Sequence, residues 1–186
     1  MGKPLVGVLV GAVAYFVWGM LSWTVIPWHN RVVKTLPEEQ LITDTLKTVI
    51  AEPGFFLFPS MNQNGKMMDH TAFAERYMKG PTGVIAFSTG GKDWMGPRKY
   101  IVAWLAAFAI AAISMLLLCL IRDRVTGTLP RILLVTSIGA VVFLAPHLSY
   151  WNWLSFPSDY TTVAAADSLA AFFVLGWAQV FFVPKS

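Results

Sequence analysis

Charged side chains are scarce in this sequence. Only 13% of the 186 residues are Asp, Glu, Lys or Arg, while 56% are hydrophobic and 14% are aromatic. A soluble domain usually carries about 25% charged residues. The shortage of charge excludes a disordered chain and argues against an ordinary soluble globular domain. The formal net charge of +4 is too small to indicate a nucleic-acid-binding protein.

Cysteine is almost missing, because Cys119 is the single one. This excludes a disulfide framework within the chain and a zinc site built from cysteines. A lone thiol in an apolar run is usually inert. The sequence also lacks the motifs of phosphate-binding loops, of H-E-x-x-H zinc proteases and of G-x-S-x-G hydrolases. These absences favour a protein that is not an enzyme.

Long apolar runs dominate what is present, and the mean hydropathy is +0.59. A helix needs about 20 apolar residues to span a bilayer. Four runs meet this length and are predicted to be transmembrane helices: residues 4–27, 100–121, 132–150 and 160–183. The first is longer than the apolar core of a signal peptide and lacks a clear cleavage site, so we expect it to be retained. The predicted fold class is an integral membrane protein, mainly α.

Basic residues in short loops predict the orientation of these helices. The loop between the second and third runs contains Arg122, Arg124 and Arg131. Such loops are retained on the cytoplasmic side. Both termini are then cytoplasmic, in agreement with Lys3 and Lys185, and residues 28–98 lie outside. We expect the chain in the bacterial inner (plasma) membrane, with the lipid bilayer as its first partner.

The segment 28–98 is predicted to be a small extracytoplasmic α/β domain inserted between the first two helices. Thr35 and Glu38 have the spacing of a capping box, which would start one helix. Asp69 is expected to cap a second helix that runs to Lys79.

Two short apolar stretches in this segment, 55–58 and 83–88, are strand candidates. Because a helix separates them, we expect them to pair in parallel. A sheet of this size has a thin core. The domain should therefore lean on the membrane surface, on the loop after the third run, or on a partner.

Asp167 is the main candidate for a functional residue. It lies in the fourth run, about 10 Å below the outer boundary at the rise of a helix. A carboxylate at that depth is costly and finds a partner. His147, beside Pro146 near the outer end of the third run, lies at a similar depth. We expect the two to form a polar pair that either binds a ligand or holds the helices together.

Metal binding is a weaker interpretation. The candidates are His29, His147 and Asp167, and separately the soft ligands Met67, Met68 and His70. No pair of ligands has the helical spacing of a metal motif. Methionines at such positions more often fill small irregular cores. The sequence assigns no cofactor.

Two further sets of residues predict contacts with lipid and between helices. Trp28, Trp151 and Trp153 are expected to be interfacial aromatic residues. Small residues would let helices approach closely: Gly7, Gly11 and Gly19 in the first run, and Ala103, Ala107 and Ala111 in the second. Gln179 could form a hydrogen bond between helices. These small faces suit contacts within the bundle, with another protein, or with a second copy.

Two hypotheses of function remain open. The first is a non-catalytic accessory or assembly subunit of a larger bacterial inner-membrane complex. The second is a membrane protein that binds a small ligand, cofactor or metal in an outer-facing pocket around His147, Asp167 and the pair Trp151 and Trp153. A membrane enzyme that uses Asp167 and His147 as an acid–base pair is a third interpretation, which no accompanying nucleophile supports.

Overall fold

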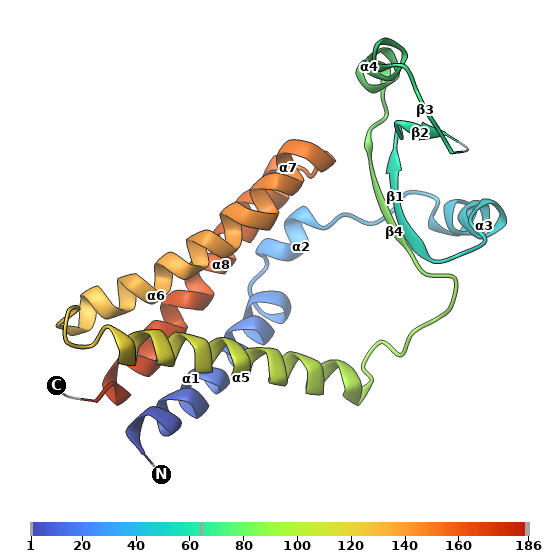
Figure 1. Ribbon diagram of the computed structural model, residues 1–186. Coiled ribbons are helices and arrows are strands. Elements are labelled where there is room, and N and C mark those ends of the chain that lie inside the picture. Colours follow the sequence, from blue (N-terminus) through green and yellow to red (C-terminus); the bar gives the residue numbers. More distant parts are fainter. Residues whose placement is uncertain (1, 64, 185–186) are drawn as a thin grey trace. The chain divides into compact units, whose positions relative to one another are not determined.

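The computed structural model describes residues 2–63 and 65–184, and Lys185, used above for orientation, lies outside them. The chain is mostly helical with a small amount of sheet, and it divides into two compact units (Figure 1). The helical unit comprises residues 1–33, 94–148 and 159–186. The α/β unit comprises residues 34–93 and 149–158.

Four helices are long and apolar enough to span a membrane, which confirms the prediction from the apolar runs and suggests a multi-pass membrane protein. They are Lys3–Thr24, Pro97–Leu120, Thr128–Leu154 and Ser158–Phe182. The first two are α1 and α5. The third joins α6 (Thr128–Val142), the π-helical turn η1 (Phe143–His147) and α7 (Leu148–Leu154). The fourth joins α8 (Ser158–Gln179) to the 3₁₀ turn η2 (Val180–Phe182).

Local sequence explains where these helices begin and how the third one continues. Pro4 and Pro97 stand in the first turns of α1 and α5, where a missing backbone N–H leaves no hydrogen bond unmade. Pro146 lies inside η1. A π-helical turn accommodates the missing backbone N–H of proline, so the helix continues past Pro146.

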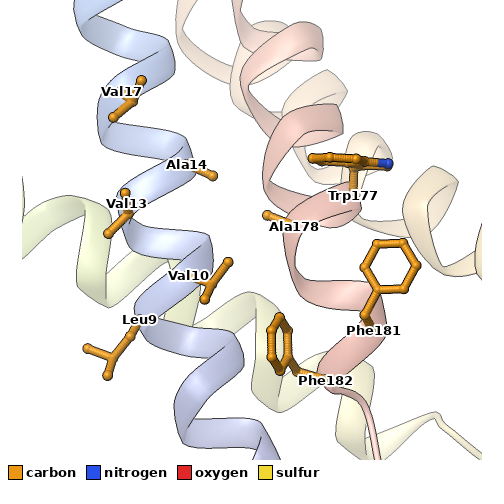
Figure 2. A pocket seen from close by; sticks show the side chains of 9 residues that line it. All are labelled: Leu9, Val10, Val13, Ala14, Val17, Trp177, Ala178, Phe181 and Phe182. Carbon is orange, nitrogen blue, oxygen red and sulfur yellow. The ribbon is translucent and has the colours of Figure 1, made fainter.

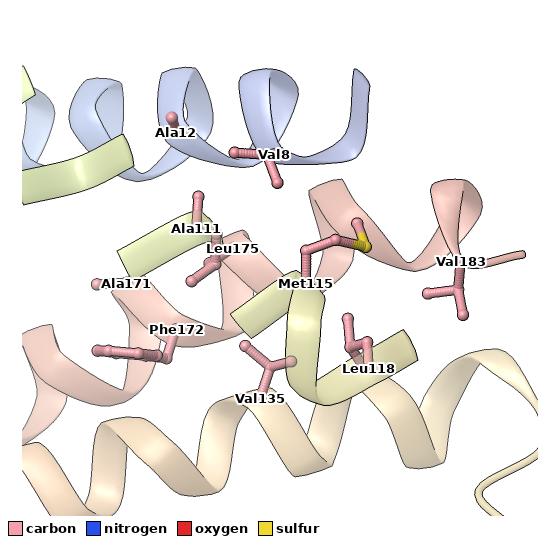
Figure 3. Packing of buried hydrophobic residues seen from close by; sticks show 10 residues of the cluster. All are labelled: Val8, Ala12, Ala111, Met115, Leu118, Val135, Ala171, Phe172, Leu175 and Val183. Carbon is pink, nitrogen blue, oxygen red and sulfur yellow. The ribbon is translucent and has the colours of Figure 1, made fainter. Parts of the chain in front are cut away.

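Side chains from all four long helices meet in one core, as Figure 3 shows. The fully buried members are mostly small or flexible, which allows close helix packing. They include Ala12 of α1, Ala111 and Met115 of α5, Val135 of α6 and Leu175 of α8.

Several glycines lie where two helices come close. A Cβ atom added at Gly11 would lie 2.7 Å from the side chain of Gln179, and one at Gly7 would clash with Met115 and Phe182. A Cβ atom added at Gly19, in contrast, would meet no described atom within 4 Å. The three alanines predicted to form a small face on α5 also differ in burial. Ala107 and Ala111 are buried, while Ala103 is exposed.

The α/β unit contains a two-stranded antiparallel sheet. Strand β1 (Gly54–Phe58) pairs with β4 (Gly83–Phe87), with Gly54 opposite Phe87 and Phe58 opposite Gly83. A hairpin of β2 (Asn62–Gln63) and β3 (Lys66–Met67) follows β1, and α4 (His70–Lys79) leads to β4. The expected parallel pairing was wrong. Parallel strands occur in sheets covered on both faces, whereas antiparallel pairs tolerate open faces such as those of β1.

The two predicted helix starts differ in outcome. Asp69 caps α4 as expected, because its Oδ2 accepts hydrogen bonds from the backbone N–H groups of Thr71 at 2.9 Å and Ala72 at 3.2 Å. The capping box was wrong. Helix α3 runs over Glu39–Val49, so Glu38 is its N-cap residue, with φ 47° and no capping side-chain bond. Only a residue further along the first turn can reach back to the cap.

Candidate functional site: a polar cluster around Asp167

Asp167 of α8 is bonded to the N-terminal part of the helical unit. Its Oδ1 accepts hydrogen bonds from Trp18 Nε1 and Ser22 Oγ of α1, each at 2.8 Å. Its Oδ2 lies 3.4 Å from Nε2 of His29 in α2 (Trp28–Val32). The Asp167 side chain is 21% exposed and that of His29 is 5% exposed. One carboxylate therefore connects three helices.

The local structure of α1 and α2 explains how these partners come together. Trp18 and Ser22 are four residues apart, so they lie on one face of α1. Helix α1 ends at Thr24, and Pro27 is the N-cap residue of the short helix α2. This turn brings His29 back onto α1, where its Nε2 lies 3.1 Å from Ser22 Oγ.

Three tryptophans surround the cluster. The ring of Trp23 stacks on His29 at 3.9 Å with an interplanar angle of 9°. Trp28 meets His29 edge to face at 5.8 Å, and its Nε1 donates to both the backbone carbonyl and the hydroxyl of Ser22 at 3.1 Å. Ser22 is fully buried. In a buried, aromatic environment, hydrogen bonds are stronger and unpaired polar groups are more costly than in water.

The hydrogen bonds around His29 indicate which of its two ring nitrogens carries the N–H hydrogen. Ser22 has one hydroxyl hydrogen, and it is donated to Asp167. His29 Nε2 must then be the donor toward Ser22 and Asp167. In the neutral ring, Nδ1 is left as an acceptor. This atom is buried and has no hydrogen-bond partner among the residues that the structure describes.

Serine, histidine and aspartate are also the residue types of a hydrolytic triad, but the geometry differs. In a triad the carboxylate binds one ring nitrogen and the hydroxyl binds the other. Here Ser22 and Asp167 both approach Nε2 of His29. The Ser22 hydroxyl is held by the carboxylate, so the ring cannot take its proton along a relay. The arrangement is suited to joining helices, and Nδ1 of the neutral ring is suited to accepting a hydrogen bond from a small donor.

The structure gives separate contacts for several other predicted site residues. His147, expected beside Asp167, lies in η1 with its ring stacked 6.4 Å from that of Phe143. Trp151 and Trp153 belong to the α/β unit, where Trp151 Nε1 donates to Ser158 Oγ at 2.9 Å and Trp153 is 75% exposed. The pocket predicted from these residues stays a prediction.

The metal candidates include one pair that the structure brings together, His29 with Asp167. Met67 ends β3 and is 71% exposed, Met68 follows it, and His70 begins α4. Within residues 2–63 and 65–184, no three His, Cys, Asp or Glu side chains lie together as metal ligands would.

A second buried polar contact joins α8 to α5. Gln179 is fully buried, and its Nε2 donates to the backbone carbonyl of Ala111 at 2.7 Å. This is the hydrogen bond between helices that the sequence suggested. Its Oε1 is buried without a partner among the described residues.

Sequence reasoning missed Trp18 and Ser22 as partners of Asp167. Their spacing on one face of α1 was a usable signal, since both lie near the same end of the run as Trp28. Comparisons with protein-family models, with curated proteins and with solved structures found no match to this chain.

Proposed function

We propose that the chain is a non-catalytic accessory subunit of a larger complex in a bacterial inner membrane. In this proposal α1, α5, α6 with η1, and α8 span the bilayer. Both termini are cytoplasmic, and residues 28–98 and the loop 151–159 lie outside. That orientation is supported by Arg122 and Arg124 between α5 and α6 and by Arg131 near the start of α6. The helical unit is then the anchor, and the α/β unit is the part that binds the partner.

The observation that carries the proposal is the burial of the α/β unit. None of its described residues is buried. Phe55 is 59% exposed, Leu57 is 48% exposed, and Phe56 and Phe58 are each 37% exposed. Large apolar side chains are normally inside a protein, and contiguous exposed ones mark a contact surface. Both faces of β1 are therefore suited to being covered by another protein.

The α/β unit also offers a recess for an anchoring side chain. A cavity of about 360 Å³ is lined by Phe58, Tyr77, Trp153 and neighbouring residues. Beside it, Thr82 Oγ1 and Ser155 Oγ are hydrogen-bonded at 2.9 Å, which ties segment 149–158 to the sheet. Apolar pockets with aromatic walls are where partner proteins insert their most important side chains.

The sheet has two strands, so each strand has an open edge. An open edge can pair with an extended segment of another chain. The partner that fits best is thus a membrane protein with an extended apolar segment outside the bilayer.

The test is purification of the full chain in mild detergent, with mass spectrometry of co-purifying proteins. We expect a stoichiometric partner with the native chain, and its loss with Phe55→Ser/Leu57→Ser, which changes one face of β1. The matched control is Leu41→Ser/Val49→Ser on α3, where the residues are 66% and 69% exposed. Purification of the native chain alone, or equal recovery of the partner with both variants, would contradict the proposal.

A second function is favoured by the unpaired Nδ1 of His29. Leaving a buried acceptor unpaired costs about 1–3 kcal/mol. A small ligand with a donor group, bound beside Asp167, would remove that cost. Asp167→Asn keeps the shape of the side chain but removes its charge. If absorption spectra and metal content of the purified protein are the same for Asp167→Asn and the native chain, the ligand hypothesis is wrong.

A further inference from the structure

A groove of about 610 Å³ runs between α1 and α5. Helix α1 contributes Tyr15, Gly19 and Trp23 among others, and α5 contributes Lys99, Ala103 and Ile110 among others. Small residues form part of both walls, which keeps the groove open. No described atom lies within 4 Å of the position of a Cβ added at Gly19.

The length of the groove matches one leaflet of a bilayer. Ile110 follows Lys99 by eleven positions along α5. At 1.5 Å per residue this corresponds to about 16 Å. The hydrocarbon core of a bilayer is about 30 Å thick, so one leaflet is about 15 Å deep. An acyl chain that lies along the groove would therefore reach from the headgroup level to the middle of the bilayer.

One end of the groove is positively charged. Among the described lining residues, Lys99 alone carries a full charge, and the rest of the lining is largely apolar. Its ammonium lies 5.5 Å from the ring centroid of Trp94 and donates to the Trp94 carbonyl at 3.1 Å. These contacts hold the cation at the groove end, and an ammonium has three donors. Trp23, Trp94 and Tyr100 at this end are residue types of the membrane interface.

The groove between α1 and α8 provides a contrast within the same molecule. It is of similar size, about 560 Å³, and Figure 2 shows its lining of Val10, Val13, Trp177, Phe181 and their neighbours. No described lining residue is charged. Nothing there would select one headgroup over another.

We propose that the groove between α1 and α5 binds one anionic phospholipid, with its headgroup on Lys99 and one acyl chain along Gly19 and Ala103. This inference rests on the membrane location of α1 and α5 in the proposed function, and it does not need the subunit role. The charge of Lys99 selects the headgroup. The apolar walls bind the acyl chain of any phospholipid. Selection of the headgroup and binding of the acyl chain can therefore be tested separately.

The experiment is native mass spectrometry of the full chain, released from nanodiscs that contain equal amounts of dioleoyl phosphatidylglycerol and dioleoyl phosphatidylcholine. We expect one retained lipid, with phosphatidylglycerol favoured about fivefold, the preference that one lysine at a membrane surface supplies. Lys99→Gln should bring the ratio to about one. Gly19→Leu should lower the retention of both lipids, because the added side chain occupies the groove.

Two control variants accompany these. Lys79→Gln removes a lysine from α4, and Ala109→Leu enlarges an exposed residue of α5 that does not line the groove. Neither should change the ratio or the amount of lipid. Ala106→Leu fills the groove from α5 and serves as a second blocking variant if Gly19→Leu does not fold.

The result that would overturn the proposal is equal retention of the two lipids by the native chain, or a preference that Lys99→Gln leaves unchanged. Extraction of the chain from membranes by alkaline carbonate would overturn the membrane location as well. A chain that resists carbonate but shows no lipid preference would overturn the lipid site alone.

Discussion

Helix α6 meets the backbone of α8 at Gly139. A Cβ atom added at Gly139 would lie 2.6 Å from the carbonyl oxygen of Ser168 and 3.0 Å from Cβ of Phe172. A backbone oxygen cannot rotate out of the way as a flexible side chain can. We therefore expect Gly139→Ala to push α6 and α8 apart.

The expected magnitude follows from two opposing effects. Overpacking a core costs about 1–3 kcal/mol. Alanine offsets part of this, because it is better than glycine inside a helix by up to about 1 kcal/mol. The net loss of unfolding free energy should be about 1–2 kcal/mol for Gly139→Ala. Gly19→Ala is the matched control, since only the helix preference changes there, and its stability should be equal to or above that of the native chain.

The assay is thermal unfolding of both variants in the same detergent, followed by tryptophan fluorescence. A loss of this size lowers Tm by about 2–8 °C in a chain of this length. The reasoning would be refuted if Gly139→Ala melted at the native temperature, or if Gly19→Ala melted below it. The first result would mean that the spacing between α6 and α8 is not fixed by the absence of a side chain at Gly139. The second would mean that replacing glycine by alanine destabilises these helices even without a close contact.

Three further predictions concern polar groups. Ser22→Ala should lower the unfolding free energy by about 1–3 kcal/mol, because it removes a buried donor to the partly buried carboxylate of Asp167. Ser137→Ala, at an exposed serine of α6, should leave thermal unfolding unchanged. Gln179→Leu should lower the Tm modestly, since a hydrogen bond between membrane helices contributes about 0.6 kcal/mol on average. Two backbone hydrogen bonds lower the pKa of Asp69, the one from the third helical position (N3) of α4 most strongly. The cap therefore stabilises the folded protein above the unfolded pKa of about 3.9, and this stabilisation is lost as the pH falls through the lowered pKa of the folded state. The NMR chemical shifts of the backbone amides in the first turn of α4 should change over that pH range. Asp69→Ala should abolish this change.

Local sequence was sufficient for the elements that depend on nearest neighbours. The apolar runs predicted the four long helices because hydrophobicity and length alone decide whether a helix can span a bilayer. The strands at 55–58 and 83–88 were also found from their apolar residues. Their direction was not, because pairing depends on how the intervening hairpin and helix return the chain, and no local residue encodes that path.

The partners of Asp167 show the same limit. Its need for a partner was evident from the sequence, since a carboxylate in an apolar run is costly. His147 was the nearest candidate along the chain, whereas the observed partners come from α1 and α2. His29 follows the apolar run, and only the turn at Pro27 carries it back onto α1. Such a reversal is a property of three-dimensional packing rather than of residue spacing.

The bond between Trp18 and Asp167 joins positions that are 149 residues apart. During synthesis, α1 with Trp18 and Ser22, and α2 with His29, are made long before the carboxylate that they share. Until α8 is made, the donors of Trp18 and Ser22 near the outer end of α1 lack this acceptor, and an unpaired donor that is withdrawn from water carries a cost. Arrival of α8 removes it in one step. A chain without its fourth helix would therefore retain polar groups on α1 and α2 whose shared partner is missing.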